Sequence, residues 1–190
     1  YIWWWGPFPA YASATVSFPQ SQAFDNNRGT AWIVPWRTGQ AAAVWLQYDF
    51  TVEQTVAYYS IMGYASDAGG SVAATQAPVG WTLYGSNDGF ATSTALDTRS
   101  GQTGWGNEEV RQFSIPAKSD GSYPAYKSFR LQITGAASSA ATAINIVELS
   151  FYNPGPAEPE YQNVNFYGDV ESTAGSITGP STIYVVELAK

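Results

Sequence analysis

Short apolar runs, each bounded by turn residues, recur along this chain at the length of β-strands. In residues 44–50, Val, Leu, Tyr and Phe alternate with Trp, Gln and Asp, which is the pattern of a strand with one buried face. No long segment carries the apolar stripe of an amphipathic helix. The same signals predict strands at residues 11–18, 44–50, 55–64, 79–85, 94–98, 110–115, 126–133 and 142–152. We therefore expect an all-β fold.

The charge balance excludes two classes of partner. Charged residues make up 12% of the chain, and the net charge of −7 includes only 8 Lys and Arg side chains, which are not clustered. Recognition of a phosphate backbone needs several positive contacts, so we expect no nucleic-acid partner. The same balance argues against attachment to anionic lipid, and no apolar run is long enough to span a bilayer.

The residue types available argue against catalysis. The chain contains no His and no Cys, which removes Ser–His and Cys–His nucleophiles and zinc sites. A glycosidase needs two carboxylates facing one another across a cleft. Glu108 and Glu109 are adjacent, so on a strand they point to opposite faces, and Asp67 and Asp88 fall in turns. We predict that the chain is not an enzyme.

The two ends of the chain differ in composition from its middle. Residues 1–10 are rich in Trp and Pro and predict an extended aromatic arm. Residues 153–160 contain three prolines and predict a linker, and residues 161–190 predict a β-hairpin around a Gly/Ser-rich turn. The main domain then spans residues 11–152. Because the chain begins at Tyr1, either a leader was removed or the sequence is a piece of a longer polypeptide.

Three consecutive tryptophans, Trp3, Trp4 and Trp5, form an apolar cluster in the predicted arm. An isolated hairpin is only marginally stable in water, so residues 161–190 also need a packing partner. One interpretation is that both ends bury themselves against other protein subunits, giving a homo-oligomer or an assembled appendage. The alternative is that they pack over the chain's own domain.

Five segments in a fixed order resemble one family. They are Ala-Phe-Asp-Asn-Asn-Arg-Gly-Thr-Ala-Trp at 23–32, Trp-Leu-Gln-Tyr-Asp-Phe at 45–50, Trp-Thr-Leu-Tyr-Gly-Ser-Asn-Asp-Gly at 81–89, Tyr-Lys-Ser-Phe-Arg-Leu at 126–131 and Ile-Asn-Ile-Val-Glu-Leu at 144–149. The ordered set resembles the galactose-binding-like jelly roll of discoidin (F5/8 type C) domains and family 32 carbohydrate-binding modules. The resemblance implies an antiparallel β-sandwich over roughly residues 11–152.

The resemblance also implies a structural Ca²⁺ site. In the family an Asp, a Thr hydroxyl, several loop carbonyls and a late-strand Glu coordinate the ion, and calcium prefers six to eight hard oxygen ligands. Carried over by position, these ligands are Ala23, Asp25, Asn27, Thr30 and Glu148. The metal-free alternative is that Asp25 caps the loop through backbone amides while Glu148 pairs with Arg28.

Sugar recognition needs a flat aromatic ring together with planar donors and acceptors. Side chains of these kinds occur in three turn-rich segments, 33–43, 65–78 and 104–107, which the resemblance implies are gathered at one end of the barrel. The candidate ligand contacts are Trp36, Arg37, Gln40, Tyr64, Asp67, Trp105 and Asn107. For Trp36 and Trp105, ordinary packing is the alternative. Galactose-binding members of the family usually use a His, which this chain lacks, so a galactose preference does not carry over.

Together these observations predict a non-catalytic recognition module, extracellular or on a virion surface, that binds a glycan or another surface ligand and is carried on a phage or bacterial appendage. The alternative is a purely structural or decoration subunit whose arm and hairpin mediate assembly without ligand binding. A third interpretation inserts Ile33, Val34 and Trp36 into a membrane as discoidin loops do. The absence of a basic rim counts against that insertion.

Overall fold

The computed structural model describes residues 10–12, 18–40, 44–68 and 73–154. By compactness the chain divides into two units, Tyr1–Ala157 and Glu158–Lys190. The cluster Trp3–Trp5, most of the predicted linker and the predicted C-terminal hairpin lie outside the described residues, and these assignments stay predictions.

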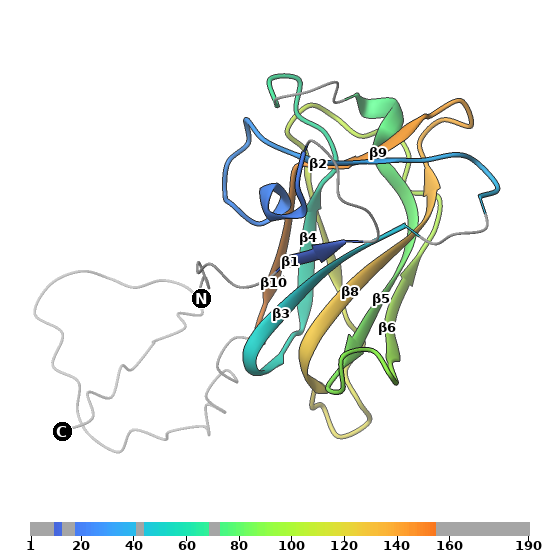
Figure 1. Cartoon of the computed structure of the whole chain (residues 1–190). Helices are drawn as coiled ribbons and strands as arrows, with labels where there is room; N and C mark the ends of the chain where they lie inside the picture. The colour runs from blue at the N-terminus through green and yellow to red at the C-terminus, as the bar shows by residue number, and fades with distance from the viewer. Residues whose placement is uncertain (1–9, 13–17, 41–43, 69–72, 155–190) are drawn as a thin grey trace, which may run out of the picture. The chain divides into compact units, whose positions relative to one another are not determined.

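The larger sheet has five antiparallel strands in the order β1-β3-β8-β5-β6 (Figure 1). Its strands are β1 (Ala10–Ala12), β3 (Val44–Thr55), β5 (Pro78–Ser86), β6 (Thr94–Arg99) and β8 (Ala125–Ala136). The alternation predicted for β3 is present, because Val44, Leu46 and Tyr48 are buried in the core while Trp45 lies on the other face.

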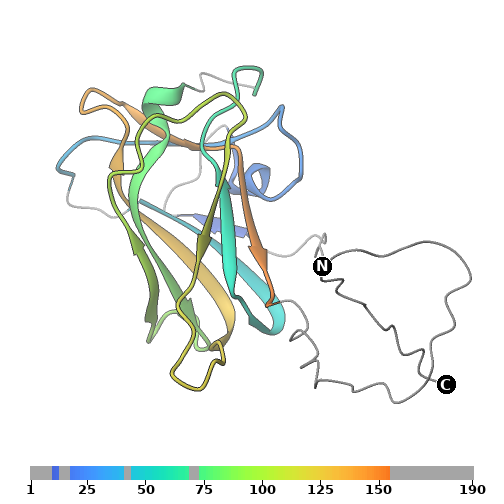
Figure 2. The same cartoon turned by 180° about the vertical axis from the view of Figure 1, so that it is seen from behind.

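The opposing layer contains a three-stranded antiparallel sheet in the order β10-β4-β7, and a separate two-stranded pair, β2-β9. These strands are β2 (Trp32–Pro35), β4 (Tyr58–Met62), β7 (Val110–Ser114), β9 (Ala143–Ile146) and β10 (Glu148–Tyr152). In Figure 2, seen from behind, the three-stranded sheet lies in front of the five-stranded one. The helical elements among the described residues are two 3₁₀ turns, η1 (Gln20–Ala23) and η2 (Ala74–Gln76). The predicted all-β antiparallel sandwich is confirmed.

The larger of two apolar clusters holds the layers together, with side chains from all three sheets. Its largest fully buried members are Trp32, Trp81, Tyr59, Phe129, Leu46, Ile61, Leu83, Leu131, Ile144, Ile146, Val34 and Val56. Each such side chain stabilises the fold by about 1.5–3 kcal/mol through its removal from water. None of the described helices is long and apolar enough to cross a membrane.

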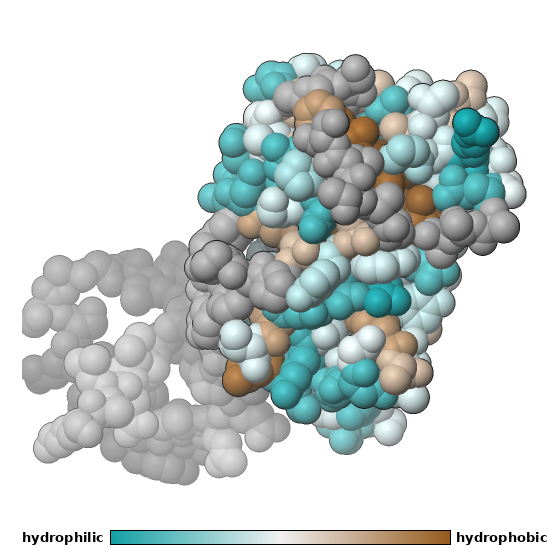
Figure 3. Space-filling view, viewed as in Figure 1, coloured by the Kyte–Doolittle hydropathy of each residue, from teal (hydrophilic) through white to brown (hydrophobic). Residues whose placement is uncertain are grey.

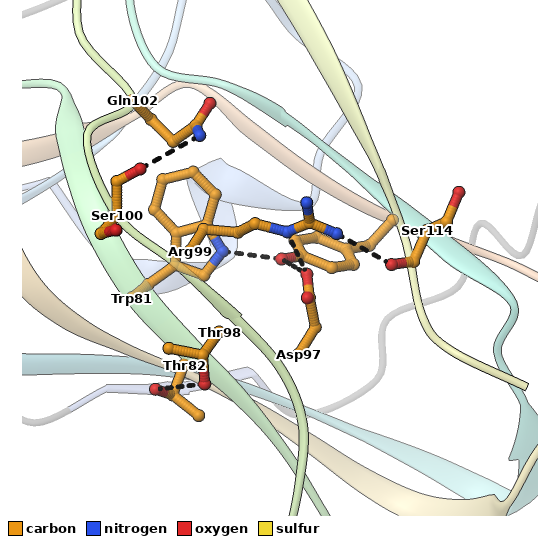
Figure 4. Close-up of polar contacts among 9 residues, drawn as sticks. Trp81, Thr82, Asp97, Thr98, Arg99, Ser100, Gln102 and Ser114 are labelled. Atoms are coloured by element: carbon orange, nitrogen blue, oxygen red, sulfur yellow. Dashed lines mark hydrogen bonds and ion pairs between the residues drawn. The ribbon is translucent and has the colours of Figure 1, made fainter.

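A polar chain crosses the core between the sheets (Figure 4). The Trp81 indole N–H donates to the Tyr59 hydroxyl at 2.7 Å, and that hydroxyl donates to Asp97 Oδ2 at 2.7 Å. Arg99 Nε donates to the same Asp97 oxygen, also at 2.7 Å, and an Nη2 hydrogen reaches the Ser114 carbonyl. Burial raises the pKa of Tyr59 far above its usual range, so the hydroxyl remains a donor. Each member of this series has a hydrogen-bond partner, and the series links β4 to β5 and β6.

Two features of the fold differ from the prediction or go beyond it. Residues 33–35 belong to β2 rather than to a long loop, because β2 pairs with β9 from Trp32 opposite Ile146 to Pro35 opposite Ala143. The predicted strand 142–152 is divided at Val147, whose N–H bonds to the Met62 carbonyl at 2.8 Å. Before Val147 the chain pairs with β2 as β9, and after it the chain pairs with β4 as β10. One apolar run therefore contributes strands to two sheets.

Candidate functional site

The loop after η1 is closed by its own polar side chains. The Thr30 hydroxyl lies 2.8 Å from Asp25 Oδ2 and 2.9 Å from the Asn27 carbonyl, and the Asn27 N–H donates to Asp25 Oδ1 at 3.0 Å. Asn26 has a positive φ of 55°, a conformation that Asn tolerates better than most residues. The loop therefore turns a carboxylate, a hydroxyl and a backbone carbonyl toward one another.

Glu148, the first residue of β10, reaches this loop from the sheet. Its Oε1 accepts the same Asn27 N–H that bonds to Asp25, at 3.0 Å, so two carboxylates converge on one amide. Burial raises the pKa of Glu148 to about 7, and the neighbouring charge of Asp25 adds to that rise. Glu148 is a partly buried carboxylate without a cationic partner among the described residues.

This donor set fits a hard divalent cation. Calcium binds carboxylate, hydroxyl and carbonyl oxygens, which are the groups that Asp25, Thr30, Asn27 and Glu148 present. Ala23 is the last residue of η1, shortly before the 25–30 loop, and it is fully buried. The described residues contain no cluster of three or more His, Cys, Asp or Glu side chains, so backbone carbonyls would have to complete the coordination.

The metal-free alternative is wrong about the partner of Arg28. Arg28 does not pair with Glu148: its Nη1 bonds to Glu108 Oε2 at 2.8 Å. Glu108 has a φ of 55°, and its N–H bonds to the Tyr64 carbonyl at 3.0 Å. The left-handed turn at Glu108 directs its carboxylate toward the 25–30 loop, and this leaves Glu148 without the arginine.

Three loops are joined at this end of the sandwich (Figure 1). The Arg28–Glu108 pair links the 25–30 loop to the β6–β7 connection, and the Ser66 N–H donates to Asn107 Oδ1 at 2.6 Å. Tyr64 is half-buried against the core, while Asp67 and Asn107 are exposed. The fully buried Asn145 donates to the Gly63 carbonyl and fixes the start of the 63–68 segment from β9. Three of the predicted ligand contacts, Tyr64, Asp67 and Asn107, thus lie together.

Trp105 packs into the protein rather than presenting a ring to solvent. Its side chain is 6% exposed, its indole N–H donates to the Pro78 carbonyl at 2.8 Å, and Gly63 lies against one side of the ring. The Arg111 guanidinium covers the ring at 4.2 Å from the centroid. Both approaches to the indole are occupied, so the packing alternative describes Trp105.

Trp36 is also a packing residue, with 6% of its surface exposed. It directly follows β2, and its N–H continues the β2–β9 ladder by bonding to the Thr142 carbonyl at 2.9 Å. Trp32, Val34 and Trp36 therefore alternate into the core, which excludes Val34 and Trp36 as exposed membrane-inserting spikes. The alternation of these three residues is the sequence signal that would have identified β2.

The turn after Trp36 presents the remaining predicted contacts. Arg37 and Gln40 close it reciprocally, since the Arg37 N–H donates to Gln40 Oε1 at 2.8 Å and the Gln40 N–H to the Arg37 carbonyl at 3.1 Å. Gly39 has a φ of 76°, which this tight turn requires. The Thr38 hydroxyl ties the turn to the Ser139 carbonyl. Arg37 is exposed, and no described contact joins it to the Tyr64–Asn107 group.

Two structural roles were missed by sequence reasoning. Glu108 bridges two loops, and Arg111 organises the 103–109 segment by donating to Glu109 and to the carbonyls of Thr103 and Gly104. Hydrogen bonding to Arg111 lowers the pKa of Glu109, which keeps this clamp charged. The sequence Glu108-Glu109-Val110-Arg111 contained one signal, because an i, i+2 Glu–Arg pair lies on one face of a strand.

No family model matches the sequence, and no curated protein matches it either. Solved structures do match the fold. An F5/8 type C domain from Bacteroides fragilis is 14% identical with a TM-score of 0.58, over 77% of this chain and 91% of that one. The family 32 module of AlyQ, in complex with 4,5-unsaturated mannuronic acid, is 18% identical with a TM-score of 0.56, over 77% and 95%.

The family 32 module of C. perfringens NanJ, in complex with galactose, is 17% identical with a TM-score of 0.54, over 76% of this chain and 92% of that one. The chain thus contains a domain with the galactose-binding-like fold of F5/8 type C domains and family 32 carbohydrate-binding modules. The fold that the five sequence segments implied is confirmed.

Proposed function

We propose that this domain is a non-catalytic carbohydrate-binding module that acts outside the cell. The observation that carries the proposal is the joining of three loops at one end of a galactose-binding-like fold, through Arg28–Glu108, Tyr64–Glu108 and Ser66–Asn107. A rigid sheet scaffold with cross-linked loops holds a binding surface at low entropic cost.

The exposed rim of this end supplies the groups that contact the sugar. Arg37 and Asn107 offer planar donors and acceptors, Asp67 accepts hydroxyl hydrogens, and the half-buried Tyr64 provides an aromatic wall. Trp36 and Trp105 support the loops from below, and Gln40 holds the Arg37 turn.

A glycan array tests this assignment. Arg37→Ala and Asp67→Ala should each weaken retention on the array with little change in melting temperature, because both side chains are exposed. Lys118→Ala is the matched control, since Lys118 is equally exposed but lies in the β7–β8 connection at the opposite end (Figure 1). Retention lost only in the control would place the site elsewhere, and no retention of any glycan by the wild-type chain would reject the function.

We further propose that the 25–30 loop and Glu148 hold one structural Ca²⁺. Asp25, Thr30 and Glu148 would supply side-chain oxygens, with carbonyls from Asn27 and Ala23. The ion would neutralise two converging carboxylates and rigidify the loop that Arg28 connects to the binding end. A ligand specific to the native state stabilises it by about 2.7 kcal/mol at a hundredfold excess over Kd. Chelator should lower the melting temperature of the wild type and leave Asp25→Ala unchanged, whereas identical wild-type melts would count against the site.

We also propose that the module belongs to a phage or bacterial surface appendage, with Trp3, Trp4 and Trp5 burying themselves against other subunits. The support is the sequence alone, because three neighbouring indoles exceed what one surface can cover. Light scattering on the full chain and on a chain lacking residues 1–9 should give an oligomer and a smaller species. A full chain that stays monomeric at high concentration would contradict this placement.

A further inference from the structure

The face of the five-stranded sheet that points away from the core carries a row of aromatic and planar polar side chains. Tyr11 in this row is exposed, Tyr84 and Arg130 are half-buried, and Gln47 is buried. The strand registers place Tyr11 opposite Gln47, Gln47 opposite Arg130, and Arg130 opposite Tyr84, which is a line across β1, β3, β8 and β5. Neighbouring strands are about 4.8 Å apart, so the row extends over about 14 Å. In Figure 3, which views the molecule from this side, hydrophilic surface lies over the middle of β3 and β8.

Arg130 is held between two aromatic rings at the centre of this row. Its guanidinium lies 4.2 Å from the Trp45 ring centroid and 3.7 Å from the Phe90 ring centroid. Gln47 Oε1 accepts from both Nε and Nη2, at 2.9 and 2.6 Å, and these two bonds fix the plane of the guanidinium. The cation is therefore ordered on both faces and along one edge.

The opposite edge of the guanidinium is uncommitted. Within the described part of the chain, Gln47 is the only residue that accepts a hydrogen bond from Arg130, and Arg130 takes part in no ion pair. Asp49 is nearby, but its Oδ1 accepts from Gln47 Nε2 at 2.8 Å, so a neutral amide stands between the two charges. An arginine has five N–H donors in a planar fork, and three remain, along the edge that suits a carboxylate.

Phe90 is positioned on Arg130 by a strained turn. Its φ is 66°, in the left-handed region that an aromatic residue rarely adopts. The turn is over-determined, because the Phe90 N–H donates to Ser86 Oγ at 2.9 Å and Asp88 accepts from the Thr92 N–H and hydroxyl. Strain of this kind costs on the order of 1–3 kcal/mol and persists where the surroundings hold it in place.

We propose that this face is a second glycan site, which binds an acidic sugar chain through the carboxylate of a uronic-acid residue. The carboxylate takes a bidentate position on the outward Nη1–Nη2 edge of Arg130, and the rings of Tyr11 and Tyr84 on either side of Arg130 support the neighbouring sugars. Charge complementarity favours the acidic ligand, since Arg130 forms no ion pair within the described residues and Asp49 bonds to the Gln47 amide instead. The site is separate from the loop end and does not depend on that end binding sugar.

Gln47→Glu is the most informative variant. The new carboxylate would form an ion pair with Arg130, neutralise it, and repel an acidic ligand, with almost no change in side-chain shape. Gln112→Glu adds the same charge on β7, in the opposite sheet, and controls for net charge. Arg130→Lys keeps the charge but removes the planar fork, and it decides the question if Gln47→Glu lowers the melting temperature.

Titration calorimetry of the full chain with tetragalacturonate, tetramannuronate and methyl-esterified tetragalacturonate tests the proposal. At least one acidic tetramer should bind the wild type and Gln112→Glu equally, and bind Gln47→Glu and Arg130→Lys about tenfold more weakly or worse. The methyl ester, which lacks the charge, should bind poorly to all four. No binding of either acidic tetramer, or equal binding of the ester, would overturn the site. Binding lost in Arg37→Ala but kept in Gln47→Glu and Arg130→Lys would assign the ligand to the loop end, overturning this proposal and supporting the first.

Discussion

Two arginines in this domain lie over tryptophan rings at the same distance, yet their surroundings differ. Arg111 is 4.2 Å from the Trp105 centroid, and Arg130 is 4.2 Å from the Trp45 centroid. Arg111 donates to both oxygens of Glu109 and to two backbone carbonyls, whereas among the described residues Arg130 donates only to the neutral Gln47. We call the Arg111–Trp105 stack closed, because Glu109 and two carbonyls accept from its guanidinium. We call the Arg130–Trp45 stack open, because one edge of its guanidinium has no acceptor among the described residues.

The difference between the two arginines comes from one residue beside each of them. A Glu two positions before Arg111 completes a clamp, which orders the 103–109 segment. A Gln opposite Arg130 orders the guanidinium but leaves its charge available. Glu148 is the reverse case, a carboxylate without an ion pair among the described residues, because Arg28 pairs with Glu108 instead. We propose an anionic ligand for the open edge of Arg130 and a metal ion for Glu148.

The largest expected effect is the difference in stability lost when each of the two tryptophans is replaced by alanine. Trp105→Ala should destabilise the domain by about 3–5 kcal/mol, because the ring is buried and its N–H bonds to the Pro78 carbonyl. Trp45→Ala should cost about 1–2 kcal/mol, since Trp45 is only partly buried on the sheet face. Urea unfolding followed by circular dichroism measures both, and equal losses would remove the distinction between the closed and open pairs.

The next largest difference is expected in the stability lost when each of the two arginines is replaced by alanine. Arg111→Ala leaves two carbonyls and the Glu109 carboxylate without their donor, and we expect a loss of about 2–3 kcal/mol. Arg130→Ala removes one neutral hydrogen-bonding partner and two ring contacts, for about 1–2 kcal/mol. Thermal melts of the two variants beside wild type provide the comparison. A larger loss at Arg130 would show that its role is structural.

The two carboxylates at the loop end should respond to pH with opposite signs in the absence of metal. The pKa of Glu148 rises from 4.5 to about 7 on folding, so the folded state holds its proton more tightly and stability falls as pH rises from about 4.5 to 7. Solvent screening limits the effect to about 1–2 kcal/mol. The pKa of Glu109 is lowered, so its contribution is lost as pH falls.

Melting curves in chelator from pH 4 to 8 should therefore show a decline above pH 5 that Glu148→Gln removes and Glu109→Gln does not. Glu109→Gln should instead reduce the loss of stability on the acid side. A wild-type curve that rises steadily to pH 8 in chelator would contradict the assignment of Glu148 as an uncompensated carboxylate.

The sequence predicts most of the fold because the alternation of apolar and polar residues indicates which face of a strand is buried. Residues 44–50, 79–85 and 126–133 lie within β3, β5 and β8 as expected. β2 was missed because it is short and ends in Pro35, although Trp32, Val34 and Trp36 alternate. The switch of partners at Val147 could not be predicted, since a buried apolar residue looks the same in either sheet.

The candidate site is less accessible to sequence reasoning, for two physical reasons. Composition shows that Trp36 and Trp105 are in turn-rich segments. It does not show that Gly63 lies against the Trp105 ring, or that the Trp36 backbone N–H extends the β2–β9 ladder to the Thr142 carbonyl. Ion pairs between distant loops, such as Arg28 with Glu108, depend on a single left-handed residue that no spacing rule identifies. Local pattern gives strands, whereas the pairing of charges is decided by tertiary geometry.

The smallest expected effect concerns the second ring over Arg130, which the Arg111 pair lacks. Phe90→Gly removes a cation–π contact of about 0.5–1 kcal/mol, but glycine adopts a φ of 66° without the strain of an aromatic residue. The relief of strain opposes both the lost contact and the entropy cost of glycine, so the free energy of unfolding should stay within about 1 kcal/mol of wild type. The ordering of Arg130 should nevertheless decrease, because one of the two rings that confine its plane is gone. Nitrogen-15 relaxation of the arginine Nε groups measures this ordering. We expect mobility to rise at Arg130 and to stay unchanged at Arg111. A large loss of stability would mean that Phe90 belongs to the core, and an equally rigid Arg130 would mean that Gln47 and Trp45 alone preorganise the open edge.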